Sequence, residues 1–260
     1  MFVIKVEVAA AVAALVIGSS MPMESEQYRR QVLADKALRP VEQLSRYHRY
    51  DFSPLWLKTD NENILGFIGN DYQRLRIKLL TARPDPRQPG RYSVTGKSKV
   101  KDNLLPFEGT FRLLHVREAA ALPEGLDGAA VPAVKTGVML AEYELKEPAG
   151  QQSAGVFRGI LSTNWYLDRS GKMQYDDLRQ HADAFSNNQC VGTWQSYKTN
   201  LTKRCNWGDH RIPAAAGLDQ GAGEFSPADK YVANGWQSYR QAWADNDAEA
   251  RRQEKAEWWK

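Results

Sequence analysis

A run of cations in this chain has a spacing that could bind anions. Between Tyr72 and Lys101 many basic residues stand against a single acid, Asp85. In two stretches the cations lie two residues apart, which places them on one face of a β-strand. If the two strands are neighbours, six cations form a patch that suits lipid headgroups, acidic polysaccharide, a phosphorylated ligand or an acidic protein. This cation stripe consists of Arg74, Arg76, Lys78, Lys97, Lys99 and Lys101.

The cation stripe has a simpler interpretation, which the pattern alone favours. Like charges that face each other across strands destabilise a sheet, so a dense stripe needs anions nearby. Acids on neighbouring strands would make the stripe an ordinary solvated outer face. The acids expected to do this are Glu108, Glu142 and Glu144.

A second group of residues combines aromatic rings with a compact polar loop. In that loop Asp209 could orient the neighbouring imidazole, and Arg211 could hold a carboxylate or phosphate. If the C-terminal section covers one end of a barrel, aromatic residues gather at its mouth and suit sugars or apolar rings. The alternative is a hydrophobic seam under the cover, beside a loop held by salt bridges. The predicted ligand-binding residues are Trp165, Tyr166, Trp194, Trp207, Asp209, His210 and Arg211.

No motif determines a reaction. His48, His115 and His181 are scattered without the spacing of a metal site, and no phosphate loop, dinucleotide fingerprint or nucleophile elbow occurs. We therefore predict no catalytic residue, no metal site and no cofactor. A glycan hydrolase would need two facing carboxylates, although solvated surface acids are the simpler interpretation. The acids that could form such a pair are Asp71, Glu108, Asp168, Asp209 and Glu224.

The two cysteines and the first 20 residues both indicate export. A Cys190–Cys205 disulfide would close a loop of about 15 residues, and two buried free thiols are the alternative. Lys5 followed by the apolar run from Val8 to Gly18 resembles a signal peptide, because the run is too short to span a bilayer. We predict a periplasmic or secreted protein that is not transmembrane once residues 1–20 are removed. A short buried helix or strand is the alternative for this segment.

The elements that position these residues alternate in polarity from Ile64 to Leu167. Such alternation is typical of half-buried antiparallel strands. Short polar connectors favour a meander that closes into a calycin-like β-barrel with short helices at both chain ends; a β-sandwich is the alternative. We predict a signal peptide (1–20), an N-terminal helical segment (21–55), a barrel core (56–170) and a loop-rich, disulfide-stapled cover (171–260) of the same domain. The expected strands are Tyr72–Leu80, Arg91–Lys101, Pro106–Val116, Gly137–Lys146 and Val156–Asp168.

Several segments carry a family resemblance. Over roughly residues 60 to 235 the chain resembles uncharacterised secreted bacterial proteins. The resemblance implies export and a calycin-like barrel, and it implies no activity and no catalytic residue. The similar segments are Gly66–Arg74, Gly96–Lys101, Pro106–Gly109, Asn164–Asp168 and Cys205–Pro213.

Composition limits the function classes. The 260 residues are 42% hydrophobic and 25% charged, and a mean hydropathy of -0.58 excludes a polytopic membrane protein. The net charge of +4 is too small to indicate a nucleic-acid partner. We expect an exported, non-enzymatic envelope protein that binds a small or glycan-like ligand or an anionic surface. The alternatives are a carboxylate-dependent glycan hydrolase and a protein–protein interaction or inhibitor module.

Overall fold

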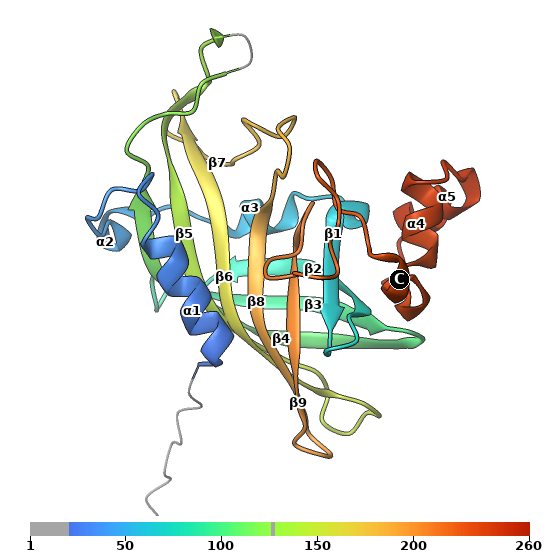
Figure 1. The fold of residues 1–260 in the computed structure, drawn as a ribbon. Helices are drawn as coiled ribbons and strands as arrows, with labels where there is room; N and C mark the ends of the chain where they lie inside the picture. The colour runs from blue at the N-terminus through green and yellow to red at the C-terminus, as the bar shows by residue number, and fades with distance from the viewer. Residues whose placement is uncertain (1–20, 126–127) are drawn as a thin grey trace, which may run out of the picture.

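The computed structural model describes residues 21–125 and 128–260, and its centre is a closed β-barrel (Figure 1). The antiparallel strand order is β5-β4-β3-β2-β1-β9-β8-β6-β7, and an additional pairing of β5 with β6 closes eight strands into the barrel. The remaining strand, β7, pairs beside β6. The predicted barrel is therefore confirmed, and the sandwich is excluded. The strands are β1 (Ile64–Ile68), β2 (Gln73–Pro84), β3 (Arg91–Val100), β4 (Asn103–Glu118), β5 (Ala133–Lys146), β6 (Gly155–Asp168), β7 (Met173–Tyr175), β8 (Asn187–Ser196) and β9 (Thr202–Asp209).

Short helices lie before and after the barrel strands. The first helix, α1 (Met23–Leu33), runs along the outer surface beside β6 and β8, whereas α4 (Gln237–Trp243) and α5 (Ala248–Lys255) lie on the other side of the barrel (Figure 1). α1 is anchored by Ser25, whose hydroxyl donates to the carbonyl of Val191 at 2.8 Å. The remaining helices are α2 (Leu44–Tyr47), α3 (Ser53–Leu57) and the 3-10 turns η1 (Asn61–Asn63) and η3 (Asp229–Asn234).

The barrel extends beyond the boundary expected at residue 170. β8 and β9 lie in the segment expected to be a loop-rich cover, and they close the barrel between β6 and β1. Their alternation is weak because inward-facing positions hold Gly192 and the polar residues Asn188 and Asp209. On the outside, α1 covers Val191, so this outward side chain is also buried.

Large aromatic side chains fill the barrel interior. Phe107, Phe111, Tyr143, Phe157 and Trp207 all belong to the buried core. The space for these rings comes partly from inward-facing glycines. A Cβ on Gly96 would lie 2.4 Å from the ring of Phe107 on the next strand, and one on Gly137 would lie 2.6 Å from the ring of Trp165. Such glycine–aromatic pairs let the interior reach close packing, as in small barrels without a large cavity.

The two barrel ends differ. One end is covered by α3, where the Trp56 indole packs edge-on against Phe111, with ring centroids 5.0 Å apart, and donates to the Thr163 hydroxyl at 3.1 Å. The other end is formed by the hairpins β1–β2, β3–β4, β5–β6 and β8–β9, and we call it the mouth. A second apolar cluster, which includes Phe67 and Trp236, lies outside the barrel and fixes α4 to β1.

Within residues 21–125 and 128–260, none of the helices combines the length and the apolar content of a membrane span. The predicted signal peptide, residues 1–20, lies outside the described residues and stays a prediction.

Candidate functional site

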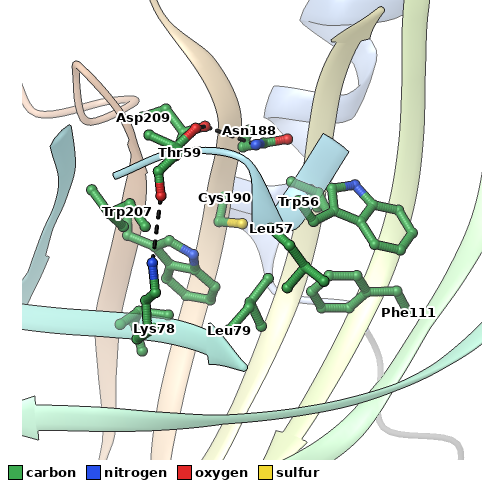
Figure 2. Close-up of a pocket in the computed structure, with 13 residues that line it drawn as sticks. Trp56, Leu57, Thr59, Lys78, Leu79, Phe111, Asn188, Cys190, Trp207 and Asp209 are labelled. Atoms are coloured by element: carbon green, nitrogen blue, oxygen red, sulfur yellow. Dashed lines mark hydrogen bonds between the residues drawn. The ribbon is translucent and has the colours of Figure 1, made fainter. Parts of the chain in front are cut away.

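A small cavity lies in the barrel interior at the α3 end (Figure 2). Its volume is about 30 Å³, which is room for roughly two water molecules. Trp56, Phe111 and Trp207 form its apolar walls, and polar groups gather at one side. The polar residues that line it are Thr59, Lys78, Asn188 and Asp209.

Asp209 is the buried acid of this cavity, with 4% of its surface exposed. Its Oδ2 accepts hydrogen bonds from Thr59 Oγ1 at 2.7 Å, Asn188 Nδ2 at 2.7 Å and Tyr175 Oη at 3.0 Å. No described residue donates to Oδ1, because all three donors converge on the other oxygen. Burial raises the pKa of Asp209 to about 7, although these donors and the charge of Lys78 act in the opposite direction. The carboxyl group can therefore hold or release a proton near neutral pH.

Lys78 lies at a gap in the barrel wall. β1 pairs with β2 at only two positions, Phe67 with Arg74 and Ile68 with Gln73, so the two strands separate beyond them. Across this gap the Lys78 ammonium donates to the Thr59 carbonyl at 3.5 Å (Figure 2). Burial lowers the pKa of Lys78, and nearby carboxylates, including that of Asp209, oppose this effect. The gap is therefore closed by a side chain and not by strand pairing.

Cys190, which also lines the cavity, does not form the predicted disulfide. In the register of β8 and β9, Cys190 faces Trp207 and Cys205 faces Gly192. The two cysteines are therefore diagonal neighbours, and diagonal Cα atoms in antiparallel sheets lie about 7 to 8 Å apart. This separation exceeds the reach of a disulfide. Burial raises the pKa of both thiols, as expected for structural cysteines of the core.

At the mouth, a depression of about 420 Å³ has an aromatic and acidic floor. Trp194 and Phe157 line it beside Glu147, which is 5% exposed. Glu147 accepts hydrogen bonds from the Ser98 hydroxyl at Oε1, and from the Gly155 amide at 2.8 Å and the Trp194 indole at 2.9 Å at Oε2. Burial raises the pKa of Glu147. Cations stand at the rim of the mouth, and they are Lys101 and Lys203.

The cation stripe forms on β2 and β3 as the spacing predicts, except that Lys101 lies in the turn after β3 with a φ of 54°. β2 and β3 are neighbours, and their register places Arg76 opposite Lys99 and Lys78 opposite Lys97. Between this outer face and the C-terminal helices lies a groove of about 640 Å³. Its cations are Arg74, Arg76, Lys99 and Lys101.

The groove and the mouth meet. Gln73, Lys101 and Asp102 line both depressions, so the two form one continuous surface path. The path leads from the cations on β2 and β3 to the aromatic floor at Trp194 and Phe157.

Of the acids expected to neutralise the stripe, Glu142 and Glu144 have other partners, and Glu108 forms no ion pair with a described residue. Glu142 pairs with Arg112 at 2.5 Å, and Glu144 pairs with Arg158 at 2.8 Å. The counterion of the stripe is Glu254 of α5, which pairs with Arg74 at 2.5 Å. Among the described residues, Lys97, Lys99 and Lys101 form no ion pair. Two of the six cations, Arg74 and Arg76, are therefore ion-paired, and the other four form no ion pair within the described residues.

The predicted ligand-binding residues do not form one site. Trp207 and Asp209 line the interior cavity and Trp194 lines the mouth, whereas His210 and Arg211 line a separate outer cleft of about 380 Å³. Trp165 is fully buried against Tyr47, with ring centroids 4.7 Å apart. Tyr166 is half-buried on the outer face of β6.

Arg211 in the outer cleft has a structural role. Its guanidinium pairs with Asp219 at 3.2 Å and donates to the Gly221 carbonyl at 2.6 Å. Beside it, burial lowers the pKa of His210, with Glu224 opposing. The chain therefore uses Arg211 to hold its own loop.

The acids considered for glycan hydrolysis are dispersed. Asp71 lines the mouth, Asp209 the interior cavity and Glu224 the outer cleft, so no two of them share a depression of the described structure. Asp168 is the last residue of β6 and accepts from the Ser170 hydroxyl of the following turn at 2.6 Å. Glu108 is exposed on β4. Within residues 21–125 and 128–260 there is also no cluster of three or more metal-binding side chains.

Several residues of these sites have no signal in the sequence. Glu147 follows an ordinary strand, and Glu254 lies about 180 positions from its partner Arg74. Thr59, Tyr175 and Asn188 come from three different elements and meet only in the fold. A local pattern cannot predict contacts of this kind.

Comparisons with protein-family models, with curated proteins and with solved structures found no match for this chain.

Proposed function

We propose that this chain is a non-enzymatic binding protein that takes an anionic, glycan-like ligand along the path from the groove to the mouth. The observation that carries the proposal is the charge of the groove. Four cations line it, and among the described residues one carboxylate, that of Glu254, forms ion pairs with them. Lys99 and Lys101 therefore offer free ammonium groups to an external anion.

The volume of the interior supports a ligand outside the barrel. A cavity of about 30 Å³ excludes a sugar ring, whereas depressions of about 420 and 640 Å³ have the size of ordinary ligand sites. At the mouth, Trp194 is 8% exposed and Phe157 is 1% exposed, so the Trp194 indole is the ring that a sugar could contact. Lys101 lies where the two depressions meet. A glycan chain whose sugar rings carry carboxylates would therefore contact both the groove and the mouth.

The other functions have less support. A carboxylate-dependent hydrolase needs two facing acids, and those considered lie in different places. An interaction or inhibitor module would use the same cations for an acidic protein, and an envelope surface would use them for anionic lipid. The predicted periplasmic or secreted location is compatible with a glycan ligand and stays part of the proposal.

The test is calorimetric titration with a size-defined oligogalacturonate, a glycan with a carboxylate on each sugar, at low salt. We expect binding by the wild-type protein and a loss of affinity of about tenfold or more for the double variant Lys99→Glu/Lys101→Glu. The matched control is Lys36→Glu/Lys172→Glu, which reverses two exposed charges away from the groove. Its affinity should stay close to that of the wild type.

Two results would overturn the proposal. One is equal loss of affinity in both double variants, which would indicate only long-range charge attraction. The other is binding to vesicles of anionic lipid, or to an acidic protein, without binding to the oligosaccharide.

A further inference from the structure

The two halves of the cation stripe differ in what covers them. Residues 248–260, which we call the strap, contain α5 and the chain end. The three β2 cations all contact the strap: Arg74 and Arg76 pair with Glu254, and Lys78 lies 4.9 Å from the ring centroid of Trp259. Lys97 and Lys99 of β3 and Lys101 of the following turn make no ion pair with any described residue. The strap therefore masks one half of a stripe that is continuous in the sheet.

Glu254 is bound in the way an external carboxylate would be. Arg74 donates to both of its oxygens, from Nη1 at 2.8 Å and from Nη2 at 2.5 Å, while Arg76 donates to Oε1 at 2.9 Å. The Ser238 hydroxyl completes the arrangement at 2.5 Å. A two-pronged guanidinium contact of this kind fits carboxylate and phosphate groups alike. The site is thus an anion seat that the chain fills with its own carboxylate.

The seat does not depend on the strap for its shape. The Arg74 guanidinium lies 5.0 Å from the ring centroid of Trp236 and 5.6 Å from that of Tyr239. Both rings belong to the apolar cluster that fixes α4 to the barrel. Without the strap, Arg74 would keep this support and still face outward beside Ser238.

The strap itself is attached mainly by polar contacts. In α5 the buried residues are Ala250 and Glu254. Besides the Glu254 ion pairs, Asn61 donates from Nδ2 to the carbonyls of Glu254 at 3.0 Å and Ala256 at 3.2 Å. An anion that reaches the seat would compete with Glu254 for the Arg74 and Arg76 guanidinium groups, whereas the apolar attachment of α4 offers an anion no group to bind. The strap is therefore the element that a polyanion would displace first.

We propose that Arg74, Arg76 and Lys78 are the masked half of the anion site, and that a carboxylate-bearing ligand replaces Glu254 and displaces the strap. This inference rests on the proposed function, because it assigns the same ligand to the β2 cations. The apparent affinity is then the intrinsic affinity multiplied by the fraction of molecules in which the strap is open. Loosening the strap should therefore strengthen binding.

The experiment compares two loosened variants with a matched control. Glu254→Gln removes the internal anion. Asn61→Ala removes the two hydrogen bonds from the η1 turn to the Glu254 and Ala256 carbonyls of the strap without a change of charge. The control, Glu249→Gln, makes the same charge change at the exposed Glu249, which contacts Arg252 and not the stripe. We expect oligogalacturonate to bind both loosened variants about fivefold or more tightly than the control. In the wild type, the ligand should speed amide hydrogen exchange in residues 248–260.

The outcomes separate this inference from the proposed function. If neither the wild type nor any variant binds the oligosaccharide, the proposed function fails. Suppose instead that the wild type binds, that the three variants bind with equal affinity, and that the ligand leaves hydrogen exchange in the strap unchanged. The proposed function then stands, and the inference of a masked seat is wrong. Should Glu254→Gln not fold because Arg74 is left buried without a partner, Asn61→Ala decides the question alone.

Discussion

The barrel holds one buried carboxyl group near each end of its interior, and the two groups are bonded differently. Asp209 at the α3 end accepts three hydrogen bonds on a single oxygen and leaves Oδ1 to the small cavity. Glu147 at the mouth accepts on both oxygens and borders a depression of about 420 Å³. Burial raises the pKa of both acids. The same chemical group therefore sits in a closed site and in an open one.

The surroundings of a buried acid determine how much stability is lost when one of its hydrogen bonds is removed. At the α3 end, Trp56 and Phe111 close the space, and roughly two water molecules are all it can hold. At the mouth, solvent is adjacent and can replace a lost partner. Loss of a hydrogen bond should thus cost more at Asp209 than at Glu147, and proton binding should be tied more closely to folding there.

The largest expected difference comes from removing each acid. Asp209→Ala leaves the Thr59, Tyr175 and Asn188 donors without their acceptor in a closed site, and we expect a loss of about 3 to 5 kcal/mol of unfolding free energy. Glu147→Ala should lose about 1 to 2 kcal/mol, because water from the mouth can reach its donors. Urea unfolding at pH 5.5 measures both. Equal losses would contradict the distinction between a closed and an open end.

A smaller effect concerns pH. The Asp209 pKa is about 7 in the folded protein against an ordinary value of 3.8, so between these values the folded state holds a proton that the unfolded state has released. Stability from this group is therefore present at low pH and is lost as pH rises from about 4 to about 7. Asp209→Asn, whose amide resembles the protonated acid, should be more stable than the wild type at pH 8 by about 2 to 4 kcal/mol.

The measurement is the unfolding free energy of both proteins from pH 4 to pH 8. Near pH 4 the two should be similar, and the difference should grow with pH. A difference that is independent of pH would show that Asp209 stays ionised when folded. Glu147→Gln is the parallel variant at the mouth. Its gain in unfolding free energy over the wild type at high pH should have the same sign and be smaller, because Glu147 borders the open mouth.

The fold was largely predictable because most strands have a local signature. Leu75, Ile77 and Leu79 alternate with the cations of β2, and the predicted adjacency of β2 and β3 is confirmed by the register. β8 and β9 were missed because Gly192 and Asn188 interrupt their apolar face. The expectation of a Cys190–Cys205 disulfide was wrong, since spacing along the chain does not reveal that two residues will be diagonal across strands.

The site was predictable only where it is local. The cation stripe follows from a period of two within each strand, and this much needs no tertiary structure. Its counterion could not be found in this way, because Glu254 comes from the far end of the chain and its neighbours form an ordinary charged helix. The same holds for Asp209: its donors, from Thr59 to Asn188, are distant in sequence. A buried acid and a surface acid look alike until the partners are known.

The smallest expected effects come from substitutions that remove a single hydrogen-bond donor at each end of the barrel. Tyr175→Phe removes one of the three hydrogen bonds to Asp209, and Trp194→Phe removes one of the two to Glu147 Oε2. Each should cost about 1 kcal/mol of stability. Because each lost donor favoured the charged carboxylate, each variant should raise the pKa of its acid further. Carboxyl-carbon NMR titration reads both acids separately. The rise should be greater for Asp209, where the cavity has room for only roughly two water molecules that could replace the phenol. If Glu147 moves as far as Asp209, water screens the two ends equally and the α3 end is as open as the mouth.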